Sequence, residues 1–146
     1  MSGVQKFLIV VRALICNDGK VVLVRKHAGR PHPLAGQWVI PGGILEAGES
    51  PGQCAEREAR EETGLRVRAV RLAEVSIKYD REPNTPSWFV KAPIILCSYR
   101  CEYVSGGLRA GDDVDQARWF SLRNAIATAG REHDRAALRE TFGALA

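Results

Sequence analysis

Three glutamates, Glu58, Glu61 and Glu62, stand at positions where an α-helix would bring their carboxylates together. Residues three or four apart are neighbours on a helix, and like-charged pairs at that spacing cost about 0.2–0.5 kcal/mol each. On a helical projection Glu58 and Glu62 share the side that carries Cys54 and Ala55, which would normally turn toward the core. A buried carboxylate must be neutralised or paired with a cation. The spacing therefore indicates a metal site.

Oxygen ligands select hard ions, and Mg²⁺ is typically held by a few carboxylates together with the phosphates of a substrate. The three glutamates therefore predict a Mg²⁺ site for a phosphate-bearing substrate, with Mn²⁺ as an alternative ion. The competing interpretation is a solvated acidic face on which Arg57 and Glu61 form an ordinary surface ion pair.

Helix signals surround these glutamates. Ser50 is a favourable N-cap, Pro51 is suited to the first helical position, and Gln53 completes a capping box with Ser50. Gly64 supplies a stop signal. The residues between Pro51 and Gly64 are therefore predicted to form one helix.

Residues 43–65 resemble the Nudix box, G-x5-E-x7-R-E-U-x-E-E-x-G-U, in which U is an apolar residue. The positions of the box are filled by Gly43, Glu49, Arg57, Glu58, Ala59, Glu61, Glu62, Gly64 and Leu65. The resemblance implies a Mg²⁺-dependent hydrolase of nucleoside diphosphates linked to another moiety, in which water attacks phosphorus. It also implies an α/β fold, an α/β/α sandwich with a mixed β-sheet.

The same resemblance implies roles for individual residues. Glu61 and Glu62 would bind metal, together with the backbone carbonyl of Gly42 or Gly43. Glu58 would bind a second ion or act as the general base. A further implied role is that Arg57 orients a glutamate of the box, either Glu49 or Glu61, through a charge-assisted hydrogen bond.

An acidic segment at residues 111–120 offers further candidates. It resembles the segment that in many Nudix hydrolases brings another acid to the metal site or supplies the base. Asp112, Asp113 and Asp115 are the candidates, with Glu102 as an additional one. The alternative is an Asp-rich turn whose side chains cap backbone groups. The choice of base between Glu58 and this segment stays open.

Two other regions are candidates for substrate binding. Arg25 and Arg30 lie in or beside a basic loop that could meet phosphates, although a solvated loop is the alternative. Tyr79, Trp88 and Phe89 lie in or beside a Pro-containing loop, where an exposed aromatic ring could stack on a nucleobase. The alternative for these aromatic residues is core packing.

Length and composition fit one domain spanning residues 1–146. The net charge of +4 would attract polyphosphates, but the chain has no zinc finger, basic zipper or RRM motif, so nucleic-acid binding is not expected.

The apolar stretch at residues 7–11 is too short to span a bilayer, and no signal-peptide pattern is found. We expect a cytoplasmic protein that does not bind membranes. Its four cysteines, which lack metal-finger spacing, are expected to be core thiols.

Hydrophobic periodicity and turn signals predict the remaining elements. Strands are expected at residues 7–15, 21–25, 38–40, 66–78, 93–103 and 117–120, turns at 17–19, 41–43 and 111–113, loops at 27–37 and 79–91, and helices at 122–128 and 134–142.

The sequence therefore favours a pyrophosphohydrolase acting on a small-molecule nucleotide. The segment at residues 112–120 resembles Nudix proteins that cleave ADP-ribose or related nucleoside diphosphate sugars, which makes these the leading substrates. The first alternative is a house-cleaning enzyme that converts nucleoside triphosphates to monophosphates and pyrophosphate. The second is a Nudix module that senses a nucleotide without cleaving it. We expect either a monomer or a homodimer.

Overall fold

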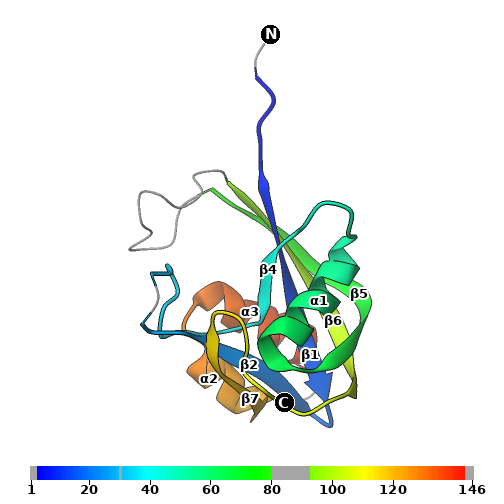
Figure 1. The fold of residues 1–146 in the computed structure, drawn as a ribbon, viewed down its shortest axis with the longest axis vertical. Helices are drawn as coiled ribbons and strands as arrows, with labels where there is room; N and C mark the ends of the chain where they lie inside the picture. Colours follow the sequence, from blue (N-terminus) through cyan, green and yellow to red (C-terminus); the bar gives the residue numbers. More distant parts are fainter. Residues whose placement is uncertain (1–2, 30, 80–92, 144–146) are drawn as a thin grey trace.

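The computed structural model describes residues 3–29, 31–79 and 93–143, and Figure 1 shows how their helices and strands are arranged. In chain order these elements are β1 (Leu8–Asn17), β2 (Lys20–Lys26), β3 (Trp38–Val39), β4 (Gly42–Ile44), α1 (Pro51–Thr63), β5 (Arg66–Lys78), β6 (Ile94–Ser105), β7 (Val114–Ser121), α2 (Leu122–Thr128) and α3 (Glu132–Phe142). Helix α1 packs on one face of the sheet, and α2 and α3 pack on the other. The predicted α/β class with a helix–sheet–helix arrangement is confirmed.

The strands of the described residues form one seven-stranded mixed sheet. Its main order is β3-β2-β1-β6-β5, while β4 also pairs with β1 and β7 also pairs with β2. β1 and β6 pair in parallel, from Leu8 opposite Ile94 to Cys16 opposite Glu102, and the other described pairs are antiparallel. β1 is therefore the central strand that joins the two halves of the sheet.

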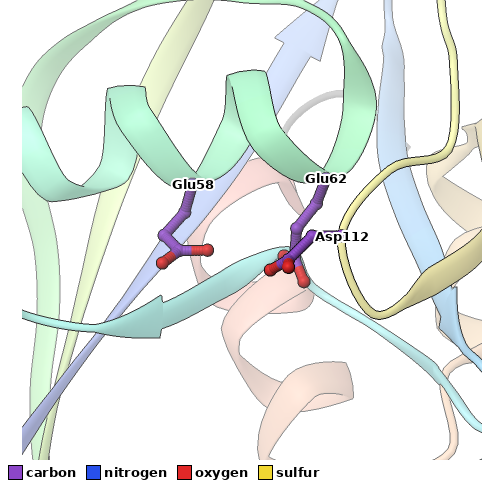
Figure 2. Close-up of side chains that lie close together, drawn as sticks. All are labelled: Glu58, Glu62 and Asp112. Carbon is purple, nitrogen blue, oxygen red and sulfur yellow. The ribbon is translucent and has the colours of Figure 1, made fainter.

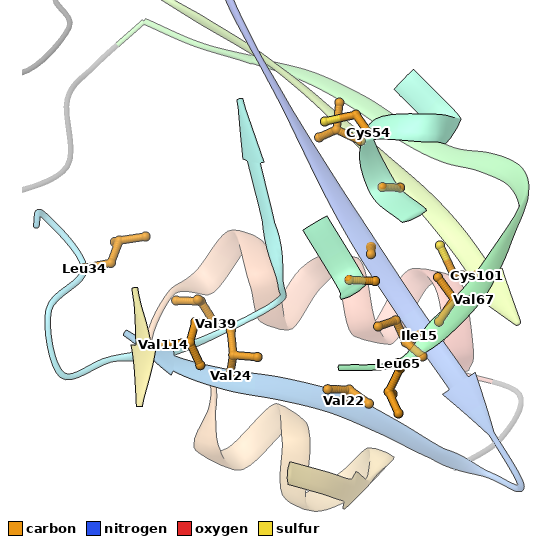
Figure 3. Close-up of a cluster of buried hydrophobic side chains, with 14 residues drawn as sticks. Ile15, Val22, Val24, Leu34, Val39, Cys54, Leu65, Val67, Cys101 and Val114 are labelled. Carbon is orange, nitrogen blue, oxygen red and sulfur yellow. The ribbon is translucent and has the colours of Figure 1, made fainter. Parts of the chain in front are cut away.

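The core has two layers because side chains alternate along β1. Val11, Ala13 and Ile15 belong to the layer under α1, which Figure 3 shows, whereas Leu14 belongs to the layer under α2 and α3. The second layer also receives Leu122, Ala125, Ala137, Leu138 and Phe142 from the two C-terminal helices. β1 is thus buried on both faces, as its apolar sequence predicts.

The predicted signals of the box helix are confirmed. The Ser50 side chain accepts a hydrogen bond from the Gln53 amide at 3.2 Å, and the Gln53 side chain accepts one from the Ser50 amide at 2.8 Å. Gly64 ends the helix with φ +75°, in the left-handed region that favours glycine. The small residues Cys54 and Ala55 are fully buried against the sheet, so the helix lies close to it.

Some element boundaries differ from the sequence prediction. β7 begins at Val114 rather than at residue 117, because its first residues pair with the end of β2, where Val114 lies opposite Lys26. α3 begins at Glu132 rather than at residue 134. Part of the predicted turn at residues 41–43 is strand β4, since Gly42 and Gly43 pair with β1. The predicted loop at residues 79–91 lies outside the described residues from residue 80 onward.

Within the described part of the chain, none of the helices has both the length and the apolar character that crossing a membrane requires.

Candidate active site

Three carboxylates meet beside the glycine strand β4. Glu58 and Glu62 project from α1, and Asp112 comes from the turn before β7, so that oxygen atoms from all three lie within 4.8 Å of one another (Figure 2). Glu62 is only 1% exposed and Glu58 only 7%, whereas Asp112 is exposed. We call these three residues the acidic cluster. An all-oxygen donor set of this kind suits a hard divalent cation such as Mg²⁺.

Two glycines let the backbone approach this cluster closely. A Cβ atom at Gly43 would lie 2.3 Å from Oε1 of Glu58, and one at Gly42 would lie 2.3 Å from the carbonyl oxygen of Val11. The amide of Gly42 donates a hydrogen bond to Oε1 of Glu62 at 2.9 Å. A side chain at residue 42 would therefore clash with the β1 backbone, and one at residue 43 would displace the Glu58 carboxylate. The β4 backbone lies directly against the two glutamates.

Lys26 balances part of the negative charge. Its Nζ donates to Oε2 of Glu62 at 2.7 Å and to both oxygens of Asp113, at 3.1 and 3.2 Å. Burial lowers the pKa of Lys26, but the charges and hydrogen bonds of Glu62 and Asp113 outweigh that effect and raise it. For Glu62, burial raises the pKa, and the opposing effects of Lys26 and the Gly42 amide are too small to cancel this rise.

The sequence analysis did not select Lys26 as a site residue. The signal was the period-two pattern of β2, in which Val22, Val24 and Lys26 point to the same face. Val22 and Val24 lie in the core layer under α1, so Lys26 also points toward that helix, where Glu62 lies.

Arg57 organises the start of the box. Its guanidinium donates to both oxygens of Glu49, at 2.8 and 2.9 Å, to Glu58 at 2.9 Å and to Glu61 at 3.1 Å. The pKa of Glu49 is lowered to about 2, first by its hydrogen bonds from Arg57 and then by the Glu46 amide. Arg57 therefore contacts both glutamates that the sequence analysis proposed it to orient.

The Glu61 carboxylate is directed to Arg57, and its side chain is 45% exposed. Among the described residues it is not grouped with the acidic cluster. Its role as a metal ligand, and that of the Gly42 or Gly43 carbonyl, remain predictions.

The predicted acids of the 111–120 segment lie in different surroundings. Asp113 is bound by Lys26 and lies 3.8 Å from Nε2 of His32, at the edge of the cluster. Asp115 is bound by Arg25 through two hydrogen bonds of 2.8 and 3.0 Å. Neither Arg25 nor Asp115 is among the described residues that line the main pocket. Glu102 is likewise remote from the cluster and pairs with Arg68 on the surface.

A pocket of about 540 Å³ opens beside the acidic cluster. Its lining includes the acidic cluster and Lys26, together with Lys78, Tyr79, Arg131 and His133. Val10, Ile94 and Leu96 supply apolar lining. Of the predicted substrate-binding residues, Tyr79 lies at this pocket and is 69% exposed. Arg30, Trp88 and Phe89 lie outside the described residues.

A second charged group, which we call the Arg12 cluster, stands on the α3 side of the sheet. Arg12 is 2% exposed and forms ion pairs with Glu74 on β5 and Asp134 on α3. Its guanidinium also donates to Ser98 at 2.9 Å and lies 3.0 Å from Nδ1 of His133. Burial, followed by the charge of a nearby arginine, lowers the pKa of His133 to about 4. Sequence reasoning treated Arg12 as part of a buried strand and assigned it no partners.

The chain matches the family model described as NUDIX domain over residues 6–141. It belongs to the Nudix family. An ADP-ribose pyrophosphatase from Methanocaldococcus jannaschii is 31% identical over 116 residues, which cover 80% of this Nudix chain and 63% of that protein. An NAD-capped RNA hydrolase, NudC from Pseudomonas aeruginosa, is 33% identical over 110 residues, which cover 75% of this chain and 34% of that protein.

The fold is also that of solved Nudix structures. A NUDIX hydrolase from Nitrosomonas europaea superposes with a TM-score of 0.75 at 24% identity, covering 95% of this chain and 90% of that one. The Nudix chain described here spans less than two thirds of the length of the two sequence relatives above.

Proposed function

We propose that this Nudix chain is a Mg²⁺-dependent pyrophosphohydrolase of nucleoside diphosphate derivatives. The observation that carries the proposal is the acidic cluster of Glu58, Glu62 and Asp112, which faces a pocket large enough for a nucleotide. A bound divalent ion would neutralise phosphate charge, orient the attacking water and lower its pKa. Mn²⁺ is an alternative ion for the same oxygen donors.

Each chain residue has a definite task in this proposal. Glu58 and Glu62 would hold the cation, with Glu61 and a β4 carbonyl as further ligands. Arg57 keeps the box glutamates in place through four hydrogen bonds to Glu49, Glu58 and Glu61. The base is Glu58 or an acid of the 112–115 turn, and Asp112 and Asp113 lie nearer the reaction site than Asp115, which is held by Arg25 outside the pocket lining.

ADP-ribose or a related nucleoside diphosphate sugar is the leading substrate. The name of the Methanocaldococcus jannaschii relative supports this choice, and the pocket also offers Lys78 and Tyr79 as lining residues besides the acidic cluster. In the reaction, the oxygen of water bonds to one phosphorus and the bridging P–O bond breaks, with its electron pair leaving on the second phosphate. ADP-ribose would give AMP and ribose 5-phosphate.

A substrate panel with Mg²⁺ tests the proposal. ADP-ribose, UDP-glucose, NAD⁺ and the deoxynucleoside triphosphates are incubated with the protein, and the products are separated by ion-exchange chromatography. We expect kcat/KM to be greatest for ADP-ribose. A tenfold preference for a triphosphate would favour the house-cleaning alternative, and nucleotide binding without turnover would favour the sensing module.

The same proposal places the enzyme in the cytoplasm as a monomer or homodimer with a small-molecule substrate. Multi-angle light scattering of the purified chain distinguishes these two assemblies.

A further inference from the structure

Lys26 places an ammonium group beside the acidic cluster. Its side chain is 8% exposed and reaches Glu62, which is the most buried carboxylate of the acidic cluster. Both oxygens of Glu62 have donors, because Oε2 accepts from Lys26 and Oε1 accepts from the Gly42 amide. Glu62 is thus held in place by donors from β2 and β4.

The two carboxylates that share Lys26 are unequal. Glu62 is 1% exposed and belongs to the acidic cluster, whereas the Asp113 side chain is 29% exposed and is not grouped with it among the described residues. Asp113 also offers both of its oxygens to Nζ, at 3.1 and 3.2 Å. Lys26 could therefore leave Glu62 and still keep a carboxylate partner.

A divalent ion and an ammonium group compete for the same buried carboxylate. The two cations repel each other, and the repulsion is strong in a site with little water. The contact of 2.7 Å between Nζ and Glu62 would place Lys26 close to any cation that Glu62 binds.

We propose that Lys26 is a positioning residue that acts as the resident counter-cation of Glu62, releases Glu62 when a divalent ion binds, and is then retained by Asp113. The inference rests on the proposed function, in which Glu62 is a metal ligand. It predicts that the metal-free site is kept in order by Lys26 and that the metal must compete with Lys26 to bind.

The alternative is a permanent ion pair that stabilises the fold whether or not metal is bound. The two differ in one thermodynamic quantity, the coupling between Lys26 and the metal. By linkage, a group whose contact is lost on ligand binding lowers the affinity for that ligand, and its removal raises that affinity by the same factor.

The test measures thermal midpoints of the parent, Lys26→Met and Lys26→Arg in EDTA and in saturating Mg²⁺. Removing one partner of a buried pair should lower the metal-free midpoint of Lys26→Met by roughly 10 °C. In Mg²⁺ we expect no more than half of that loss. Lys26→Arg keeps the charge and should retain most of the metal-free stability of the parent.

Arg25→Met is the matched control, because Arg25 precedes Lys26 on β2 and its partner Asp115 lies two residues after Asp113, the second partner of Lys26. Its ion pair lies outside the pocket lining. Its midpoint loss should be the same with and without Mg²⁺.

Isothermal titration with Mg²⁺ supplies the second readout. We expect Lys26→Met to bind Mg²⁺ about tenfold more tightly than the parent, which corresponds to about 1.4 kcal/mol. An equal midpoint loss in EDTA and Mg²⁺, with unchanged or weaker Mg²⁺ affinity, would show a permanent pair and overturn the inference.

Two further outcomes test the inference. If Lys26→Met folds in Mg²⁺ but unfolds on chelation while the parent survives, the inference is supported, and failure to fold in both conditions overturns it. If the parent itself binds no Mg²⁺, the proposed function fails before the role of Lys26 is reached.

Discussion

Two charged groups contribute residues to the lining of the same pocket, and they differ in how their charges are paired. In the acidic cluster, Glu62 shares the ammonium of Lys26 with Asp113, and Glu58 shares the guanidinium of Arg57 with Glu49 and Glu61. In the Arg12 cluster, Arg12 pairs with Glu74 and Asp134, and Arg131, which directly precedes α3, adds a second guanidinium that pairs with Asp134.

A buried group with balanced charge needs no ligand and fixes the positions of the elements that supply it. A group with excess negative charge needs a cation from solution. Because Lys26 and Arg57 are each shared among several carboxylates, these contacts leave net negative charge around Glu58 and Glu62. We therefore propose a chemical role for the acidic cluster and a structural role for the Arg12 cluster.

The largest expected effect is on turnover. Glu62→Gln should lower kcat/KM by more than about 100-fold, since even residues that only support metal ligands contribute 10–100-fold. The amide oxygen can still accept from Gly42, and Lys26 keeps Asp113, so the metal-free midpoint should change little. Product release with Mg²⁺ and melting in EDTA measure the two quantities. Glu132→Gln, in an exposed pair on α3, is the control. Full activity of Glu62→Gln would remove the acidic cluster from the mechanism.

The Arg12 cluster should show the reverse behaviour. Arg12→Met leaves Glu74 without this partner in a part-buried site, and the loss of a buried ion-pair partner typically lowers the free energy of unfolding by about 3–5 kcal/mol. Urea denaturation measures it, with Arg68→Met in an exposed pair expected to cost no more than about 1 kcal/mol. Mg²⁺ affinity should match that of the parent. A large fall in Mg²⁺ affinity with no loss of stability would contradict the assignment.

A smaller effect should appear in the pH dependence of stability. The pKa of His133 lies at about 4 in the folded protein and at 6.5 in its unperturbed state. The unfolded chain therefore binds the proton more readily, so the contribution of His133 is present above pH 6.5 and is lost as pH falls toward 4. The slope is at most about 1.4 kcal/mol per pH unit.

Replacing His133 with Gln should remove that slope in urea denaturation measured between pH 4.5 and 6.5. The acidic cluster should be unaffected, so Mg²⁺ binding at pH 8 should equal that of the parent. An unchanged slope would mean that His133 does not contribute to acid sensitivity.

The smallest expected effect concerns Tyr79, which lines the pocket but is not part of the acidic cluster. Stacking of an aromatic ring on a base contributes about 1–3 kcal/mol, and the 69% exposure of Tyr79 places it at the lower limit. Tyr79→Ala should raise the KM for ADP-ribose about fivefold with little change in kcat. A fall in kcat at constant KM would instead place Tyr79 with the catalytic groups.

Local signals in the sequence were sufficient for the parts of the site that lie within one helix. Ser50, Gln53 and Gly64 fix where α1 begins and ends, and the spacing of Glu58 and Glu62 fixes which face carries the acids. The burial of these two acids was predicted from Cys54 and Ala55 on the same side. These inferences needed only the helical period and capping chemistry.

The parts that were not predicted depend on contacts between distant residues. Arg12 contacts Ser98, which is 86 positions away in the sequence, and Asp134, which is 122 positions away. The residues next to Arg12 in the sequence indicate neither partner. Lys26 reaches Glu62 only because β2 ends beside α1. The extension of β7 back to Val114, directly after the turn at Asp112 and Asp113, likewise arises from pairing with β2.

The parallel pairing of β1 with β6 has a consequence for how the chain acquires its structure during synthesis. The paired residues are 86 positions apart, so the central strand must leave the ribosome long before its parallel neighbour exists. At about 5–20 residues per second, that interval is roughly 4–17 seconds. During this time β1, with its run of apolar residues, has an unpaired edge that other chains could meet. The step that closes the sheet is therefore the one at which a nascent chain of this protein most needs protection from aggregation.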